Sequence, residues 1–155
     1  MDITFRKLPD GRHEILVTGR KGPDVRLPAH PDGPRIPHDL AHAAVEEALG
    51  IHDGFWGAVA DGATFQGMEP IEPTRHRRSG LKVLRRKGEA VLAAELSVNW
   101  AYRVWSGLPV TGRAVGRSPL DEAALRRATA ALDAVADRWA GVPEGGSLVW
   151  RWSRH

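Results

Sequence analysis

The segment near the C-terminal end, residues 147–152, constrains the fold more than any other part of the chain. Its sequence reads SLVWRW, in which Leu148, Trp150 and Trp152 occupy alternate positions, the pattern of a β-strand with one buried face. The long segments before it have helical periodicity, and a strand needs a partner for its backbone N–H and C=O groups. The strand is therefore predicted to join β-type segments at the other end of the chain.

The first thirty residues supply those segments. Residues 3–6 alternate between apolar and polar side chains, and Pro-Asp-Gly at 9–11 follows with turn chemistry. Residues 13–18 are rich in β-forming side chains, and residues 24–27 form a third short candidate strand. Together these segments predict a hairpin or small meander, one face of which packs against helices.

Helices are predicted for most of the rest. Residues 28–37 carry four prolines and are expected to be an irregular loop. A helix follows from Pro37 or His38 to Gly50, and a shorter one begins after Asp53 as N-cap and stops at Gly62. Residues 63–78 are expected to form an exposed excursion.

Two long helices follow this excursion. The first covers residues 81–105, with an apolar stripe interrupted by one charged residue, Glu95. The second is expected to begin with Ser118 as cap and Pro119 at its first position, and to pack antiparallel to the first. The predicted fold class is α+β: a small antiparallel sheet, made of the N-terminal hairpin or meander plus the C-terminal strand, packed on a layer of about four helices.

Composition limits the kind of protein this is. The chain has 155 residues, 42% of them hydrophobic, which suffices for one packed core, so residues 1–155 are predicted to form a single domain. The sequence contains no cysteine, which excludes a disulfide scaffold, a cysteine nucleophile and a zinc ribbon. No apolar run approaches the ~20 residues of a membrane helix, and the N-terminus lacks the apolar stretch of a signal peptide. A cytoplasmic protein without a membrane partner is expected.

One motif carries chemistry, the sequence His38-Asp39-Leu40-Ala41-His42 at the start of the first helix. Histidines four residues apart lie one turn apart on the same face of a helix, a spacing that suits two imidazoles sharing a metal ion. Zinc or another divalent metal is the expected cofactor, with His38 and His42 as ligands. The alternative is structural, because histidines near a helix start also serve as caps or as half-buried hydrogen-bonding groups.

Zinc also needs a third protein ligand. Glu95 is the first candidate, because a carboxylate on an apolar helix stripe is expected to face the core and needs a partner there. The alternative for Glu95 is a buried salt bridge to an arginine. Glu46, one turn beyond His42, is the second candidate, and the pair His52 and Asp53 is the third.

A metal held in this way predicts a hydrolase acting on a small-molecule substrate. A metal-activated water is the expected nucleophile, and Asp39 or Glu46 is expected to handle protons or to orient a histidine. The tryptophans are expected to belong to the core, with the exception of Trp56, which is the best candidate for a pocket wall because it lies close to the histidine helix.

Several known helices resemble this one. The segment 38–42 is similar to the His-Glu-x-x-His helix of gluzincin-type metalloproteases, with Asp39 in place of the glutamate, and to the His-Asp pair of the HD metal phosphohydrolases. The chain also resembles small proteins of actinobacterial type in residues 37–42 (PHDLAH), 54–57 (GFWG) and 139–152. That resemblance implies a bacterial source and no particular activity. The excess of arginine, 18 of 22 basic residues, is in keeping with a GC-rich bacterial genome.

A basic segment supports a second, non-enzymatic hypothesis. Residues 75–87 hold seven of the basic residues and no acid, which leaves the rest of the chain at −4, since the whole carries +3. Such a segment could neutralise phosphates of a nucleic acid or bind another acidic partner. The residues expected to make these contacts are Arg75, Arg77, Arg78, Arg85 and Arg86. The alternative is a solvated helix face.

Overall fold

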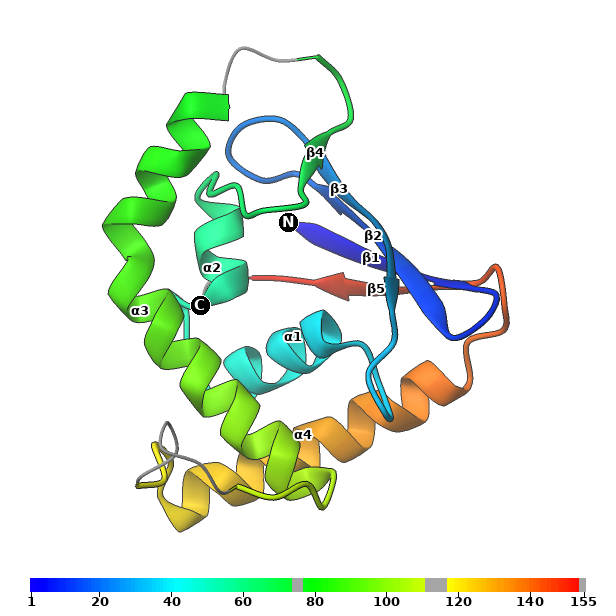
Figure 1. Cartoon of the computed structure of the whole chain (residues 1–155), viewed down its shortest axis with the longest axis vertical. Helices are drawn as coiled ribbons and strands as arrows, with labels where there is room; N and C mark the ends of the chain where they lie inside the picture. Colours follow the sequence, from blue (N-terminus) through cyan, green and yellow to red (C-terminus); the bar gives the residue numbers. More distant parts are fainter. Residues whose placement is uncertain (74–76, 111–116, 154–155) are drawn as a thin grey trace.

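The structure is a computed structural model that describes residues 1–73, 77–110 and 117–153. Its helices and strands follow one another in the order β1 (Asp2–Leu8), β2 (Arg12–Thr18), β3 (Val25–Pro31), α1 (His38–Leu49), α2 (Phe55–Ala60), β4 (Glu69–Pro70), α3 (Arg77–Trp105), α4 (Glu122–Ala140) and β5 (Ser147–Arg151). The predicted α+β class, with a small antiparallel sheet on a helical layer, is confirmed (Figure 1).

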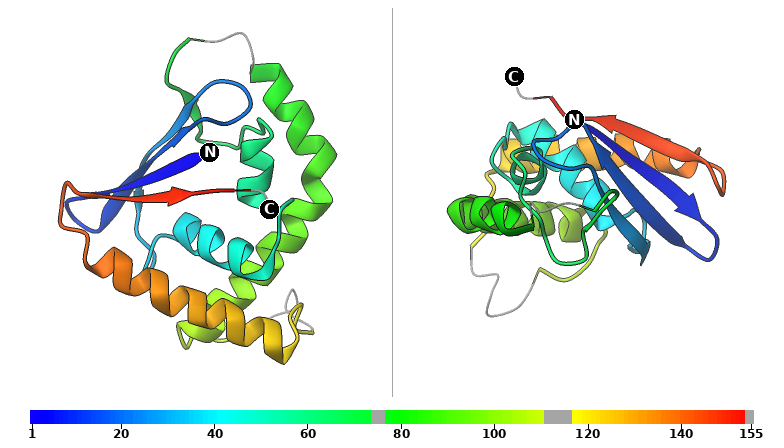
Figure 2. Two further views of the ribbon diagram at one scale, coloured as in Figure 1. Left: turned by 180° about the vertical axis from the view of Figure 1, so that it is seen from behind. Right: turned by 90° about the horizontal axis from the view of Figure 1, so that it is seen from above.

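The five strands form one antiparallel sheet in the order β4-β3-β2-β1-β5. The C-terminal strand joins the N-terminal hairpin as predicted, with Phe5 of β1 opposite Leu148 of β5. Alternate residues point to one face, where Ile3, Phe5 and Ile15 are buried. The helices lie on that face alone (Figure 2), so one face of the sheet is buried and the other, called here the wet face, is exposed to solvent.

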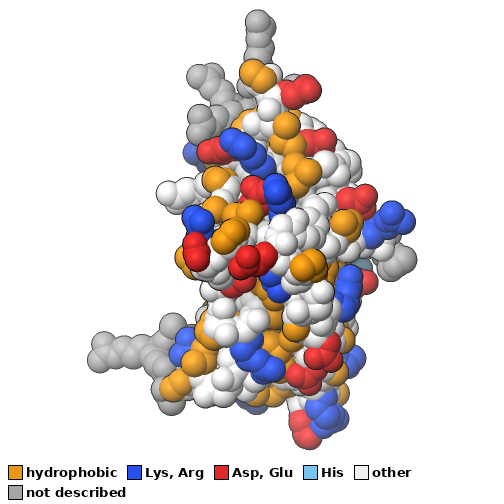
Figure 3. All heavy atoms as spheres, turned by 90° about the vertical axis from the view of Figure 1, so that its right-hand side faces the viewer, with side chains coloured by type: hydrophobic (Ala, Val, Ile, Leu, Met, Phe, Trp, Pro, Cys, Tyr) orange, Lys and Arg blue, Asp and Glu red, His pale blue; other side chains and the backbone are white. Residues whose placement is uncertain are grey.

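The wet face carries paired charges. Arg6 on β1 contacts Glu14 on β2 at 3.0 Å, and Arg26 on β3 contacts Glu69 on β4 at 3.1 Å. Acidic and basic side chains are interspersed on the side where the strands lie in Figure 1, as the space-filling view of that side shows (Figure 3). Exposed pairs of this kind contribute little to stability, about 0–1 kcal/mol each.

Two strands differ from the predicted ones. Residues 28–31 belong to β3 although Pro28 and Pro31 were expected to prevent regular structure there. Prolines are tolerated at edges and beside irregularities. Both conditions hold, because β4 covers only the beginning of β3 and the register against β2 shifts between His13 and Ile15. The two-residue strand β4 lies inside the segment expected to be an exposed excursion, and Met68 just before it is buried.

The first two helices lie close to their predicted positions. Helix α1 ends at Gly50, whose φ of 67° is the left-handed cap conformation that favours glycine. Helix α2 is preceded by Gly54 instead of the expected cap Asp53. Because glycine has no side chain, the first N–H groups of the helix need an acceptor from elsewhere. Their acceptor is Glu46 of α1.

The two long helices do not run side by side as an antiparallel pair. Helix α4 crosses the C-terminal end of α3 obliquely and packs along α1 (Figure 1). Its apolar stripe is buried as predicted at Ala128, Leu132, Val135 and Trp139. The α3 stripe is buried only towards its C-terminal half, at Val98 and Tyr102, while Leu81 is half exposed.

Helix α4 begins later than the sequence suggested. Asp121 is its N-cap and accepts a hydrogen bond from the Ala124 N–H at 2.7 Å. The Ser118 hydroxyl, the expected cap, accepts instead from the Leu120 N–H at 3.2 Å, in a turn that precedes the helix. Aspartate is as good an N-cap as serine, so the sequence alone did not distinguish the two candidates.

Among the described residues, no helix combines the length and apolar character that crossing a lipid bilayer requires.

The hydrogen bond from the Ala124 N–H to Asp121 can be tested with Ser118 as the matched control. We expect Asp121→Ala to lower the free energy of unfolding by about 1 kcal/mol, because an N–H of α4 loses its acceptor. Ser118→Ala should cost only a few tenths of that, since its hydroxyl lies outside the helix. Urea unfolding of both variants measures the difference, and a larger loss for Ser118→Ala would show that the cap is misassigned.

Candidate metal centre

Helix α1 presents both motif histidines on one face. His38 and His42 lie one turn apart, with ring centroids 4.9 Å apart and ring planes at 78°. His42 is buried and His38 is half-buried. Tyr102 of α3 packs edge-on against the His38 ring at 5.7 Å, and Phe55 of α2 lies 5.4 Å from the His42 ring. Aromatic contacts from two other helices therefore hold the pair in place.

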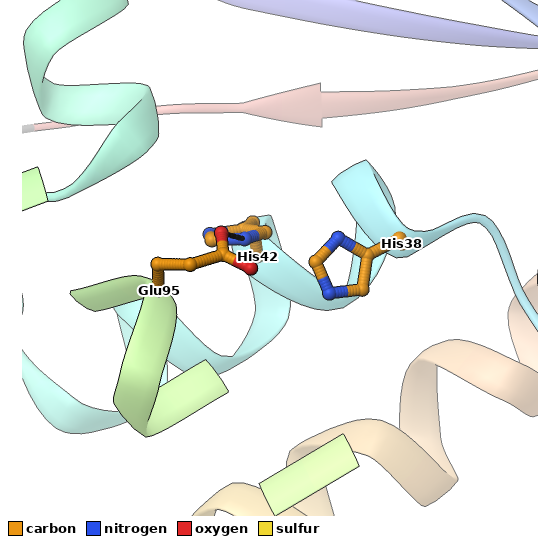
Figure 4. A group of neighbouring side chains, drawn as sticks. All are labelled: His38, His42 and Glu95. Atoms are coloured by element: carbon orange, nitrogen blue, oxygen red, sulfur yellow. Dashed lines mark hydrogen bonds and ion pairs between the residues drawn. The ribbon is translucent and has the colours of Figure 1, made fainter. Parts of the chain in front are cut away.

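Helix α3 brings Glu95 to this pair. Its Oε2 atom lies 2.8 Å from Nε2 of His42, so the predicted contact between Glu95 and the histidine helix is confirmed (Figure 4). The expectation that Glu95 faces the core is wrong, because 45% of its side chain is exposed. Glu95 reaches the site from the rim, at the boundary between the packed helices and solvent.

Glu46 has a different role from a third ligand. Its side chain is fully buried and its Oε1 atom lies 2.9 Å from Nδ1 of His42. Oε1 also accepts from the Phe55 N–H at 2.8 Å, and Oε2 accepts from the Trp56 N–H at 3.1 Å. A carboxylate with three such donors is satisfied where it is. It orients His42 and leaves Nε2 of that ring facing Glu95.

These contacts shift the proton affinities of the three groups. Burial acts to lower the pKa of His42, but its hydrogen bonds to Glu46 and Glu95 and their charges outweigh burial and raise the pKa to about 9. The hydrogen bond to His42 lowers the pKa of Glu95, although burial acts in the opposite direction. Burial lowers the pKa of His38, helped by the charge on His42. Without metal, His42 is therefore a charged imidazolium between two carboxylates, and His38 stays neutral.

One ligand atom from each of His38, His42 and Glu95 lies within 4.8 Å of the other two. This is the one group of three or more potential ligands at such distances in the part of the chain that the structure describes. Two imidazoles and one carboxylate are a donor set that suits zinc and leaves a fourth position open. The same contacts, with a proton in place of a metal, make a salt-bridged structural cluster, so the donor set allows metal binding without requiring it.

Asp39 lies beside the cluster but points elsewhere. Its Oδ2 atom lies 4.0 Å from Nε2 of His13, a buried histidine on β2. Nδ1 of His13 lies 2.8 Å from Oδ1 of Asp32. Sequence reasoning missed His13 and Asp32. The available signal was the alternation of β2, which places His13 on the same inward face as Ile15 and Val17.

A cleft of about 330 Å³ opens between α1 and the sheet, next to the cluster. His13, His38, Asp39 and Phe55 are among the residues that line it. Trp56, the expected pocket wall, is fully buried instead and donates its ring N–H to the Asp39 carbonyl at 2.9 Å. The neighbouring Phe55 takes the place at the cleft that was expected for Trp56.

The remaining candidate residues do not meet the cluster. His52 is exposed, and Asp53 bonds Lys87 of α3 at 2.5 Å, so neither belongs to the group of ligands around His42. In the basic segment, Arg85 and Arg86 are exposed on α3. Arg75 and the side chains of Arg77 and Arg78 lie outside the described residues. Binding of nucleic acid by this segment stays a prediction.

No family model, no curated protein and no solved structure matches this chain.

The raised pKa of His42 predicts how stability depends on pH. An imidazole that titrates near 9 when folded and near 6.5 when unfolded stabilises the fold fully below pH 6.5. This contribution is lost as the pH rises through 9, and it is on the order of 3 kcal/mol. We expect the free energy of unfolding of metal-free protein, measured with urea, to fall between pH 6.5 and pH 9.5.

The control is His52→Gln, which removes an exposed histidine and should leave the fall of the free energy of unfolding with pH unchanged. His42→Gln should flatten it. A wild-type stability that is constant across this range would contradict the charged state assigned to His42.

The position of Glu46 predicts opposite effects for two glycine substitutions. A Cβ at Gly54 would lie 2.6 Å from the carboxyl carbon of Glu46, so Gly54→Ala should displace that carboxylate and destabilise the protein by about 1–3 kcal/mol. Gly88 on α3 has space for a methyl group among the described residues, and Gly88→Ala should stabilise by about 0.5–1 kcal/mol. Thermal melts compare the two. A neutral Gly54→Ala would show that the carboxylate lies elsewhere.

Proposed function

We propose that this protein binds a divalent transition metal, with zinc as the best match, through His38, His42 and Glu95. The observation that carries the proposal is the approach of ligand atoms from two helices far apart in the sequence, all within 4.8 Å of one another. Histidine and carboxylate are ligands that zinc accepts in proteins. The three groups come from α1 and α3, so their arrangement is a property of the tertiary fold.

The hydrogen bond between Glu46 and His42 supports this proposal. Histidines that ligate metals commonly donate their other ring N–H to a carboxylate, which sets the tautomer and strengthens the ligand. Glu46 occupies that place at Nδ1, 2.9 Å away, so that Nε2 is the atom directed at the metal position. Nε2 and Glu95 are 2.8 Å apart, so binding of a metal would require the Glu95 carboxylate to move away from the ring. The half-exposed Glu95 side chain has the freedom for that movement.

The cleft supports a reaction at the metal. His38 lies at the metal position and also lines the cleft, so a small molecule held there would be next to the open coordination position. A metal in such a position supplies a water molecule of lowered pKa as nucleophile. Hydrolysis is the reaction class we propose, with Glu46 orienting His42. Asp39, which lines the same cleft, is the acid available for proton transfer.

Isothermal titration with zinc tests the proposal on protein that was purified without a metal-affinity column and then treated with chelator. We expect one equivalent to bind, with an affinity that rises between pH 6 and pH 9 because zinc must displace the proton on His42. His42→Ala should abolish binding, and Glu95→Gln should weaken it about tenfold or more. The matched control is His52→Ala, which should bind like wild type. Absence of a stoichiometric site in folded wild-type protein would refute the proposal.

A further inference from the structure

A second histidine, outside the proposed metal site, is buried with a hydrogen-bond partner at one of its two ring nitrogens. His13 on β2 is 1% exposed, and its Nδ1 lies 2.8 Å from Oδ1 of Asp32. Its Nε2 has no hydrogen-bond partner among residues 1–73, 77–110 and 117–153. Buried polar atoms are nearly always paired, so an unpaired one beside a cleft points to a missing partner.

The atoms around Nε2 indicate what that partner is. A carboxylate oxygen of Asp32 accepts, so the hydrogen between it and His13 sits on Nδ1, and in this tautomer Nε2 carries an acceptor lone pair. Oδ2 of Asp39 lies 4.0 Å from Nε2. That separation is too long for a hydrogen bond. Two acceptors therefore face each other across a gap that a group with two hydrogens to donate can bridge, at about 2.8 Å from each.

The cleft at this gap has the charge and the shape to bind a small positively charged ligand. Asp39 is the one carboxylate among the described residues that line it, and no lysine or arginine lines it in the described chain, although the whole sequence carries +3. Leu27, Phe55 and Phe65 supply apolar surface beside the polar end. Its volume of about 330 Å³ suits a ligand the size of a small aromatic or aliphatic amine.

We propose that this cleft is a binding site for a small primary amine, whose ammonium group donates to both Nε2 of His13 and Oδ2 of Asp39. The apolar part of the ligand lies against Phe55 and Phe65. Asp32 is a positioning residue that sets the tautomer of His13. The site needs no metal, so it goes beyond the proposed metal centre.

Entry of the amine requires one local movement. Nε2 is sealed from solvent, whereas the Asp39 side chain is 26% exposed. His13 is held by Asp32 and by the edge of Trp139, whose ring centroid is 6.5 Å away. Asp39 is thus the group that turns aside to admit the ligand, and the histidine is the fixed half of the site.

The probe is 2-phenylethylamine, titrated into the full chain in the presence of a metal chelator and followed by calorimetry. We expect saturable one-to-one binding. The N,N,N-trimethyl derivative keeps the positive charge but has no N–H donor, and it should bind at least about tenfold more weakly, since one charge-assisted hydrogen bond is worth about that factor. Because chelator is present, failure of the zinc titration does not affect this result.

Variants locate the site. Asp39→Asn and His13→Phe should each weaken binding of the amine about tenfold or more, while Asp10→Asn, at an exposed carboxylate in the β1–β2 turn, should leave it unchanged. If His13→Phe fails to fold, Asp39→Asn tests the proposal alone, because the Asp39 side chain lies at the surface of the cleft and its replacement should not prevent folding. Equal binding of the two amines, wild-type affinity in Asp39→Asn, or no saturable binding would each overturn the proposal.

Discussion

The helical layer depends on one buried carboxylate. The carboxyl group of Glu46 has no contact with solvent, and burying it is costly unless its oxygens have hydrogen-bond partners. The partners are two backbone N–H groups at the start of α2 and the ring of His42. His42 in turn bonds Glu95 of α3. A single chain of hydrogen bonds therefore fixes how α1, α2 and α3 sit against one another, and the proposed metal centre is its outer end.

In this structure Nε2 of His42 and Glu95 lie at hydrogen-bond distance. The proposed metal would take the place of the proton between them, so proton and metal would compete for the same position. Glu46 and the α2 backbone could keep their contacts in that exchange, because they meet the other ring nitrogen of His42. Glu95 is the member of this hydrogen-bonded chain with access to solvent, and it is the group that would have to move.

Local patterns were enough to predict most of the helices and strands. Periodicity located α1 and β5, because burial of one face produces a regular spacing of apolar residues along the sequence. The contact of Glu95 with the histidine helix could be predicted as well, although the burial from which it was predicted is wrong, because Glu95 is half-exposed. What sequence reasoning missed depends on distant neighbours. Asp53 is a good cap in isolation, but Glu46 of another helix accepts from the first N–H groups of α2 instead. His13 could not be recognised as a candidate site residue because Asp32 and Asp39 come close to it only in the folded chain.

The pairing of β5 with β1 has a consequence for the order in which the chain can fold. Strand β1 is an inner strand of the sheet only because residues 147–151 return to it from the far end of the sequence. Because residues 147–151 are synthesised after β1, this edge of β1 has no partner strand until they have emerged from the ribosome. The backbone groups of β1 on that side lack their partners throughout that interval. A chain in which β5 is not yet in place therefore presents a free strand edge at β1, and free edges of this kind can pair with strands of other molecules.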